Sequence, residues 1–292
     1  MTVASPAQTL SRAPARDHII DVLIAERAPK LAASPAWAVL RPLLYSFLDY
    51  AKARRMADAI EPLPGRAALE HVSRLLGVQV TTQGLGHIPP RGRLIVVCNH
   101  PTGIADGIAV YDALKAVRPD LCFYANSDAH RVAAGLSDML IPVEWVEAKR
   151  TRERTRETLL LTREALEAER CLVIFPSGRL ARRQPDGRLR DPPWAPSAVS
   201  LARRYETPIA PMHVAGPWSA MFHFFNRFSA ELRDVTLFHE LLNKQGQAFS
   251  LTVGRAIPPE ALEGEPTEAI ARLKAFVEAE LPGDPERAFV WS

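Results

Sequence analysis

The stretch RLIVVCNHPTGIADG, residues 93–107, decides the fold, because it joins a continuously apolar run to a glycine-containing loop and the start of a helix. A run that is apolar at every position indicates a strand buried on both faces, as in parallel sheets covered by helices. The run CLVIF, residues 171–175, has the same character. We therefore predict an α/β fold, with a mixed, largely parallel sheet covered by helices.

From residue 78 onward, short apolar runs alternate with helical patterns. We predict strands at 78–83, 94–98, 121–125, 141–145, 171–175, 209–214 and 250–253. Helices are predicted between them at 106–116, 129–138, 151–168, 195–205, 235–244 and 266–280. No repeat or linker divides residues 78–292, which we predict to form one catalytic domain.

Residues 1–77 form a different region. A flexible leader is expected over residues 1–16, which are rich in Ala, Ser, Pro and Arg, and helices are expected at 17–28, 35–57 and 66–76. The N-terminus lacks the basic and apolar segments of a signal peptide, and no apolar run has the length of a membrane span. These features favour a cytoplasmic location.

The helix expected at 35–57 carries an apolar stripe at helical spacing. Such a stripe is typical of a side that faces the core, and also of a helix that lies on a membrane surface. Aromatic, aliphatic and basic residues occur together here: Trp37, Leu40, Leu44, Tyr45, Phe47, Leu48, Lys52, Arg54 and Arg55. Both readings remain open, and the second predicts attachment to the inner face of the cell membrane.

Composition excludes several classes of protein. The 292 residues are 47% hydrophobic and 24% charged, close to the averages for soluble globular domains. The formal charge of +3 is too small to indicate nucleic-acid binding. Cys98, Cys122 and Cys171 lie in apolar contexts without C-x-x-C spacing, which indicates buried thiols in a reducing compartment.

Common catalytic motifs are missing from the sequence. It contains no G-x-x-x-x-G-K-[ST], no G-x-G-x-x-G after a strand, no H-E-x-x-H and no G-x-S-x-G. The P-loop, dinucleotide-binding, zincin and standard serine hydrolase classes therefore lose their main support.

The loop NHPTGIADG, residues 99–107, is the first candidate site. Ligands of open α/β sheets gather at the carboxyl ends of the strands, where this loop begins. His100 and Asp106 lie near its two ends, and Gly103 lets the backbone fold back between them. The carboxylate can accept the Nδ1 proton of His100 and leave Nε2 to take a proton from a substrate. The alternative is a helix cap at Asp106 beside a structural histidine.

The segment IFPSGRLARR, residues 174–183, follows the second buried strand. Pro176, Ser177 and Gly178 predict a sharp turn, and Arg179, Arg182 and Arg183 offer guanidinium groups that suit phosphate or carboxylate. A solvated basic turn is the alternative. The same alternative applies to KRTRERTR, residues 149–156.

The segment ETPIAPMHVAG, residues 206–216, is a weaker signal. Pro208 and Pro211 bracket a strand, and His213 within it is expected to be a core histidine with its hydrogen bonds satisfied rather than a second base.

In this order, the blocks resemble those of the glycerolipid acyltransferase superfamily over residues 78–260. NHPTGIAD resembles its His-x4-Asp block, FPSGR its F-P-E-G-T-R block and PIAPMHVAG its P-[VI]-x-P block. The spacing of NHPTGIADG, with RDPPWAPSAVSLARR and FHELLNKQG further along, is most similar to the bacterial hemolysin-like branch, which includes acyltransferases of ornithine lipids.

The chain departs from the wider family at the acceptor block. Ser177 stands where the family has glutamate, and Leu180 where it often has serine or threonine. Five residues rather than four separate His100 from Asp106. No counterpart of the family's second block is recognisable, and Lys149, Arg150 or Arg152 could supply its charge. These departures argue against glycerol 3-phosphate or lysophosphatidic acid as the acceptor.

The resemblance implies transfer of a fatty acyl group from acyl-CoA or acyl carrier protein to a hydroxyl of a lysolipid at a membrane surface, with no cofactor and no metal. It assigns His100 as the base and Asp106 as its orienting partner. The acceptor or donor would be bound by Asn99, Gly103, Ser177, Gly178, Arg179, Arg182 and Arg183. The backbone N–H groups near Gly178 or Gly103 are candidate oxyanion donors. A hydrolase using the same pair, and a non-catalytic lipid-binding protein, are the alternatives.

Overall fold

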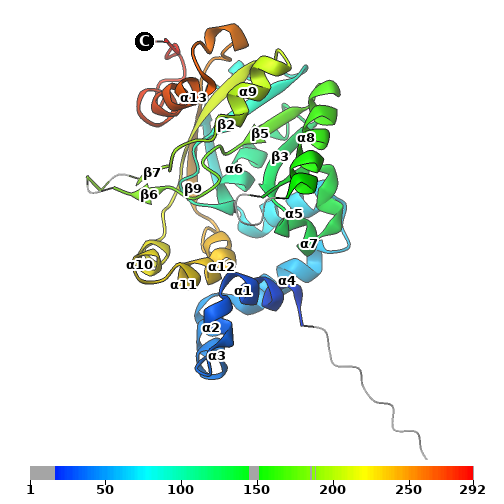
Figure 1. The fold of residues 1–292 in the computed structure, drawn as a ribbon, viewed down its shortest axis with the longest axis vertical. Coiled ribbons are helices and arrows are strands. Elements are labelled where there is room, and N and C mark those ends of the chain that lie inside the picture. The colour runs from blue at the N-terminus through cyan, green and yellow to red at the C-terminus, as the bar shows by residue number, and fades with distance from the viewer. Residues whose placement is uncertain (1–16, 145–150, 185, 188, 292) are drawn as a thin grey trace, which may run out of the picture.

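A seven-stranded mixed sheet in the strand order β1-β9-β8-β2-β5-β3-β4 organises the protein (Figure 1). The computed structural model describes residues 17–144, 151–184, 186–187 and 189–291. Only the β8–β9 pair of this sheet is antiparallel within those residues. The strands are β1 (Gln79–Gln83), β2 (Leu94–Cys98), β3 (Leu121–Asn126), β4 (Leu140–Val143), β5 (Cys171–Ile174), β8 (Ile209–Ala215) and β9 (Ala248–Val253). The predicted fold class is confirmed.

Helices cover both faces of the sheet (Figure 1). Their bounds are α1 (Ile19–Arg27), α2 (Pro29–Ala33), α3 (Trp37–Phe47), α4 (Tyr50–Ile60), α5 (Gly65–Leu76), α6 (Ile104–Leu114), α7 (Asp128–Val132), α8 (Arg152–Glu167), α9 (Ser197–Arg204), α10 (Ala220–Phe228), α11 (Ala230–Val235), α12 (Leu237–Leu242) and α13 (Pro266–Ala275).

The central strand β2 contributes to two apolar cores, one on each face. Leu94, Val96 and Cys98 pack with α1, α4, α5, α6 and α12, whereas Ile95 and Val97 pack with α8, α9 and α13. All five side chains are fully buried. This alternation explains why the sequence is apolar at every position of the strand, since successive side chains point to opposite faces.

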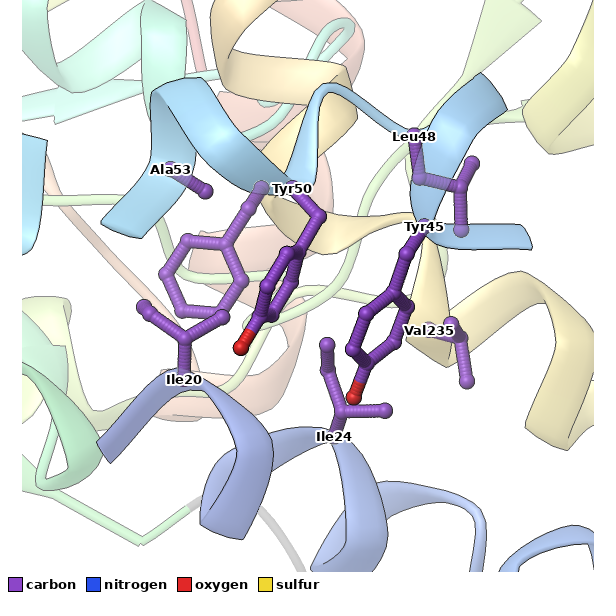
Figure 2. A pocket seen from close by; sticks show the side chains of 8 residues that line it. Ile20, Ile24, Tyr45, Leu48, Tyr50, Ala53 and Val235 are labelled. Carbon is purple, nitrogen blue, oxygen red and sulfur yellow. The ribbon is translucent and has the colours of Figure 1, made fainter. Parts of the chain in front are cut away.

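The helix predicted at 35–57 is two helices. Asp49 has a left-handed conformation with φ 54°, which ends α3 and turns the chain into α4. The rings of Tyr45 and Tyr50 stack across this turn at 3.9 Å between centroids. Both hydroxyls donate to Asp21, at 2.8 and 2.5 Å. Figure 2 shows the two tyrosines beside a small apolar cavity, which is lined by residues of α1, α3, α4, α11 and α12.

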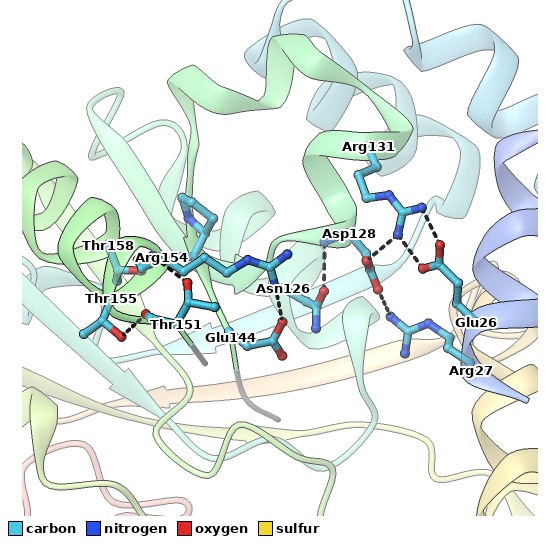
Figure 3. A network of polar contacts seen from close by, with 11 residues as sticks. Glu26, Arg27, Asn126, Asp128, Arg131, Glu144, Thr151, Arg154, Thr155 and Thr158 are labelled. Atoms are coloured by element: carbon cyan, nitrogen blue, oxygen red, sulfur yellow. Dashed lines mark hydrogen bonds and ion pairs between the residues drawn. The ribbon is translucent and has the colours of Figure 1, made fainter. Parts of the chain in front are cut away.

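The N-terminal helices are attached to the sheet region by burial and by ion pairs. Buried residues of α1, α4 and α5 belong to the same apolar cluster as residues of β2, β3 and β5. At the surface, Arg27 of α1 contacts Asp128 of α7 at 2.6 Å, and Glu26 accepts from both terminal nitrogens of Arg131 (Figure 3). One apolar core therefore continues across the predicted domain boundary near residue 77.

Several elements differ from the expectations. The two-stranded hairpin of β6 (Arg182–Arg183) and β7 (Leu189–Arg190) was not predicted, nor were α10 and α11. The helix expected at 129–138 consists of α7 and a 3-10 helix, Ala134–Asp138, and the helix expected at 266–280 ends in a π-helical turn, Phe276–Glu280. The predicted leader, 1–16, and Trp145 lie outside the described residues. No described helix is both long enough and apolar enough to span a bilayer.

Candidate functional site

The three predicted blocks meet at the carboxyl edge of β2, β5 and β8. The side-chain amide of Asn99 donates to the carbonyl of Val214 at 2.9 Å and accepts from its N–H at 2.6 Å, which joins the ends of β2 and β8. The N–H of Ala181 donates to the carbonyl of His100 at 2.9 Å, which joins the loops after β5 and β2. Asn99 is 7% exposed, so its side chain fixes the strand ends beneath the site.

His100 and Asp106 are paired as predicted. Nδ1 of His100 lies 2.9 Å from Oδ2 of Asp106. The carboxylate is fully buried, whereas the imidazole is 17% exposed, and Phe175 packs against the ring at 4.6 Å between centroids. Nε2 of His100 has no hydrogen-bond partner among the described residues. With the Nδ1 proton donated to Asp106, Nε2 is the basic nitrogen that a substrate can reach.

Asp106 is held from three further directions. It accepts the N–H groups of Thr102 and Gly103 at 2.9 and 3.0 Å and the hydroxyl of Thr102 at 2.6 Å. Asp106 is the third residue of α6, so one carboxylate both caps this helix and orients the histidine. The two alternatives stated for this residue are therefore compatible.

Gly103 has a backbone conformation that only glycine adopts readily, with φ 102° and ψ −144°. A Cβ at this position would lie 3.2 Å from Cδ2 of Leu180, so the two loops pack closely here. The N–H of Gly103 is donated to Asp106, and that of Gly178 to the carbonyl of Phe175 at 3.0 Å. The N–H groups of these two glycines are therefore not available as oxyanion donors, because each has an internal acceptor. The expectation of donors near Gly103 or Gly178 is left with the neighbouring amides.

Asp191 fixes the backbone of the loop after β2 at His100, and the sequence analysis did not predict this residue. Its two oxygens accept the main-chain N–H of His100 at 3.1 and 3.0 Å, and one accepts the indole N–H of Trp194 at 2.9 Å. Its own N–H donates to Glu278 at 2.7 Å. Burial raises the pKa of Asp191 to about 6. The available signal was an acidic residue before Pro-Pro-Trp in an arginine-rich segment.

The arginines after β5 lie in different surroundings. Arg179 and Arg183 are exposed, and the guanidinium of Arg183 lies 5.4 Å from the ring centroid of Trp218. Arg182 is partly buried with its guanidinium 5.4 Å from the centroid of Phe222. Nη1 of Arg182 is buried and finds no hydrogen-bond partner in the described part of the chain.

The surroundings of Arg182 are positively charged. Burial lowers its pKa, and Arg233 and Arg179 lower it further, whereas Asp234 opposes the shift. Burial and Arg182 also lower the pKa of His223 on α10. A cation that is desolvated beside other cations, with one nitrogen unpaired, is suited to bind an anion. The sequence predicted Arg182, but the partners from α10 and α11 are visible only in the fold.

Other sequence expectations concern structural residues. His213 is partly buried and its Nδ1 lies 2.9 Å from the carbonyl of Val277, as expected for a satisfied core histidine. Cys98, Cys122 and Cys171 are buried free thiols, as predicted, and burial raises the pKa of each. No cluster of metal-ligating side chains occurs among the residues described.

The basic segment 149–156 is only partly described. Lys149 and Arg150 lie outside the described residues, and Arg152 is an exposed residue in the first turn of α8. Arg154 contacts Glu144 at 3.0 Å beside the cap residue Thr151 (Figure 3). Ser177 donates its hydroxyl to the carbonyl of Arg179 at 2.8 Å, which stabilises the turn.

A family model, two named relatives and a solved structure are similar to this chain. A family model described as Acyltransferase matches residues 79–215. The chain is 25% identical over 207 residues to a lyso-glycine lipid O-acyltransferase of Phocaeicola vulgatus, over 69% of this chain and 72% of that protein. It is 23% identical over 207 residues to a protein of the same name from Bacteroides thetaiotaomicron, over 69% and 74%. The 1-acyl-sn-glycerophosphate (LPA) acyltransferase PlsC of Thermotoga maritima aligns with a TM-score of 0.47 and 16% identity, over 94% of this chain and 98% of that chain.

Proposed function

This chain belongs to the glycerolipid acyltransferase superfamily as a lipid O-acyltransferase that acts on lysolipid-type acceptors, and from this premise we propose its mechanism. The acceptor hydroxyl attacks the thioester carbonyl of acyl-CoA or acyl carrier protein. Nε2 of His100 takes the hydroxyl proton and returns it to the leaving thiolate, so that the C–O bond of the ester forms as the C–S bond breaks. No acyl-enzyme is required.

The observation that carries this proposal is the 2.9 Å contact between His100 Nδ1 and Asp106, with Nε2 left for substrate. The pair lacks a serine among its hydrogen-bond partners in the described residues, so the nucleophile is the acceptor's own hydroxyl. Asp106 stabilises the imidazolium that forms during attack.

The acceptor we favour is a lysolipid with an amino acid head, bound through its carboxylate. Arg182 supplies the charge-assisted hydrogen bonds, because its Nη1 is buried and unpaired among the described residues. The relatives named for lyso-glycine lipid support this class. The ornithine lipid acceptor suggested by the sequence belongs to the same class. Ser177 and Leu180, which replace the family's usual residues, favour it over lysophosphatidic acid.

The oxyanion requires donors other than the two glycines. The N–H groups of Ser177, Arg179 and Leu180 have no acceptor within the described residues. Ser177 lies within the turn closed by the Gly178 N–H, and Arg179 and Leu180 follow it. This turn comes directly after β5 and contains Phe175, whose ring packs against the imidazole. We assign the oxyanion donors to this group of amides.

The reaction is tested by mass spectrometry of products from acyl-CoA or acylated carrier protein with lyso-glycine lipid, lyso-ornithine lipid and lysophosphatidic acid. We expect ester formation with the amino acid lysolipids. Asp106→Asn should lower kcat by about tenfold or more, because an amide stabilises the imidazolium poorly. Release of free fatty acid in place of ester would identify a hydrolase. Vesicle binding without turnover of any donor would identify a lipid-binding protein.

Attachment to the membrane is assigned to α3. None of its side chains is buried, and Val39, Leu43 and Phe47 are 77%, 57% and 69% exposed. Trp37, Leu44 and Tyr45 pack against the protein instead. Lys52, Arg54 and Arg55 are exposed just beyond and attract an anionic surface at ~1 kcal/mol each.

The N-terminal segment cannot be deleted to test this assignment, because α1 and α4 bury Ile20, Leu23, Met56 and Ile60 in the core. Leu43→Ser/Phe47→Ser is the suitable variant. We expect it to stay folded and to sediment less with phosphatidylglycerol vesicles at low salt, and we expect high salt to release the unsubstituted protein in part. Unchanged sedimentation of the folded variant would contradict the assignment.

A further inference from the structure

The helix α10 has two faces of different character. Its inner residue Phe222 is 7% exposed and contacts the guanidinium of Arg182, next to the proposed acceptor site. On the outer side, Phe224 and Phe228 are 60% and 66% exposed, and their rings lie 4.9 Å apart. Trp218, which precedes the helix, is 47% exposed.

No acidic residue occurs in the segment 218–228, WSAMFHFFNRF, whereas Arg227 is an exposed cation within it. A short helix with exposed aromatic rings, a cation and no acidic group is complementary to an anionic membrane surface. Scattered exposed apolar residues are common, but aromatic rings in contact one helical turn apart form a continuous patch.

The position of α10 relates this patch to α3. Glu231 of α11 accepts the N–H groups of Lys30 and Leu31, at 3.2 and 2.8 Å, and so holds α2, which leads into α3. Figure 1 shows α10 and α11 beside α1 to α3, at the end of the molecule below the sheet. A bilayer that contacts α3 is therefore also close to α10.

We propose that the outer face of α10 is a second membrane contact, which brings the acceptor site of Arg182 to the lipid surface. This inference rests on the proposed function, since it explains how a lysolipid passes from the bilayer to His100. The partner is a bilayer that contains anionic lipid.

The test compares Phe224→Ser/Phe228→Ser with the control Leu159→Ser/Leu160→Ser. The control leucines lie on α8 and are each 52% exposed. Sedimentation is measured with vesicles of phosphatidylglycerol and phosphatidylcholine. Turnover is measured with a long-chain lysolipid in the same vesicles and with a short-chain lysolipid dissolved as monomers.

We expect the α10 variant to lose about tenfold or more in vesicle partitioning and in kcat/KM for the vesicle-borne acceptor. Its activity on the dissolved acceptor, and both activities of the control, should stay within about twofold of the unsubstituted protein. Equal partitioning of the two variants would overturn the proposal. If the unsubstituted protein is a dimer by light scattering and the α10 variant a monomer that still binds vesicles, the patch is a contact between two copies. The sedimentation experiment tests the membrane contact of α10 even if no acyl transfer is found. Failure of this proposal can therefore be distinguished from failure of the proposed acyltransferase function.

A second inference concerns Asp191 and stands on different contacts. Asp106 orients the ring of His100, whereas Asp191 accepts its main-chain N–H. Asp191 is 6% exposed and is fixed by Trp194. The same segment holds the other loop of the site, because the N–H of Ala195 donates to the carbonyl of Pro176 at 3.0 Å.

The geometry assigns Asp191 as a positioning residue, which sets where the base stands without touching the substrate. Asp191→Asn turns an acceptor into a group that also donates, so one side of the amide faces the N–H donors unfavourably. We expect kcat to fall about tenfold while KM for donor and acceptor stays within about twofold. Amide exchange at His100 should become faster, which a change confined to the substrate site would not cause.

Trp194→Phe covers the case in which Asp191→Asn fails to fold, because it removes one donor to the same carboxylate and keeps an aromatic ring. It should lower kcat less and in the same direction. Asp112→Asn, at the far part of α6 where Asp112 pairs with Lys115 at 2.8 Å, is the matched carboxylate control. A folded Asp191→Asn or Trp194→Phe with unchanged kcat, or with a raised KM alone, would overturn the assignment.

Discussion

The loop after β2 and the loop after β5 lie at the same edge of the sheet, but their charged side chains differ in burial and in hydrogen bonding. In the first loop, Asp106 is fully buried and each of its oxygens accepts a hydrogen bond. In the second, Arg179 and Arg183 are exposed, and Arg182 keeps a buried nitrogen without a partner in the described chain.

The difference suits the first loop to proton transfer and the second to ligand binding. Groups that are already held in place by hydrogen bonds need little reorganisation during a reaction, and this is what a base and its orienting partner require. A guanidinium with a nitrogen unpaired among the described residues, such as that of Arg182, can obtain a hydrogen-bond partner from a ligand. The comparison predicts that substitutions in the first loop change kcat, and substitutions in the second change KM.

The largest effect is expected for His100→Ala. Removal of the general base should lower kcat by ~10² to 10⁴-fold while KM changes little. Acyl-transfer kinetics and circular dichroism measure activity and folding, and His71→Ala on α5 is the control histidine. A folded His100→Ala variant with nearly full activity would end the comparison, because the first loop would then have no catalytic part.

The second prediction concerns how the free energy of unfolding depends on pH through Asp191, which holds the first loop at the N–H of His100. The pKa of Asp191 is raised from 3.8 to about 6 in the fold, so the folded protein keeps this proton over a range in which the unfolded chain has released it. The stability that this group contributes is therefore present at acid pH and is lost as pH rises through about 6. The difference in free energy of unfolding between the protein and Asp191→Asn should shift by up to about 3 kcal/mol between pH 4 and 7. Urea titrations measure it.

If that difference stays constant with pH, the carboxyl is not the desolvated group described here. The direction is also diagnostic. The unsubstituted protein should lose stability relative to the variant as pH rises, and the opposite trend would indicate an ion pair that lowers the pKa of Asp191.

The smallest effects are expected in the second loop. Arg182→Ala should raise KM for an amino acid lysolipid about tenfold with kcat nearly unchanged, because a partly buried charge-assisted hydrogen bond is lost. Arg179→Ala should have a smaller effect on KM, because its guanidinium is exposed and its interactions are screened by water. Steady-state kinetics with both substrates measure this. If Arg182→Ala lowers kcat alone, Arg182 belongs with the catalytic group and the separation of the two loops fails.

The α/β class and most strands could be predicted from the sequence because burial on both faces leaves a continuous apolar run, as in β2 and β5. The contact between His100 and Asp106 was predictable for a similar reason, since both lie in one short loop. Helix ends were harder to predict. The break at Asp49 depends on the stacking of Tyr45 and Tyr50 and on their shared acceptor Asp21, which is far away in the sequence.

The apolar stripe of residues 37–51 shows this limit clearly. Its pattern was compatible with burial in the core and with contact to a membrane surface. In the structure, part of the stripe is buried and part is exposed. Leu48 is 6% exposed and packs in the core, whereas Phe47 is 69% exposed. Periodicity reports which residues share a helix face, but it does not report which part of that face meets another element.

By itself the sequence determined the sheet, the order of the blocks along the chain and the pairing of His100 with Asp106, because these depend on local hydrophobicity and short spacing. Only the tertiary structure decided which groups surround them. Asp191 accepts the N–H of His100 from 91 positions away in the chain, and Phe222 of α10 packs against Arg182, a residue of the β6–β7 hairpin that the sequence did not predict. Such contacts follow from how the elements pack, and packing is set by the whole core rather than by any one segment.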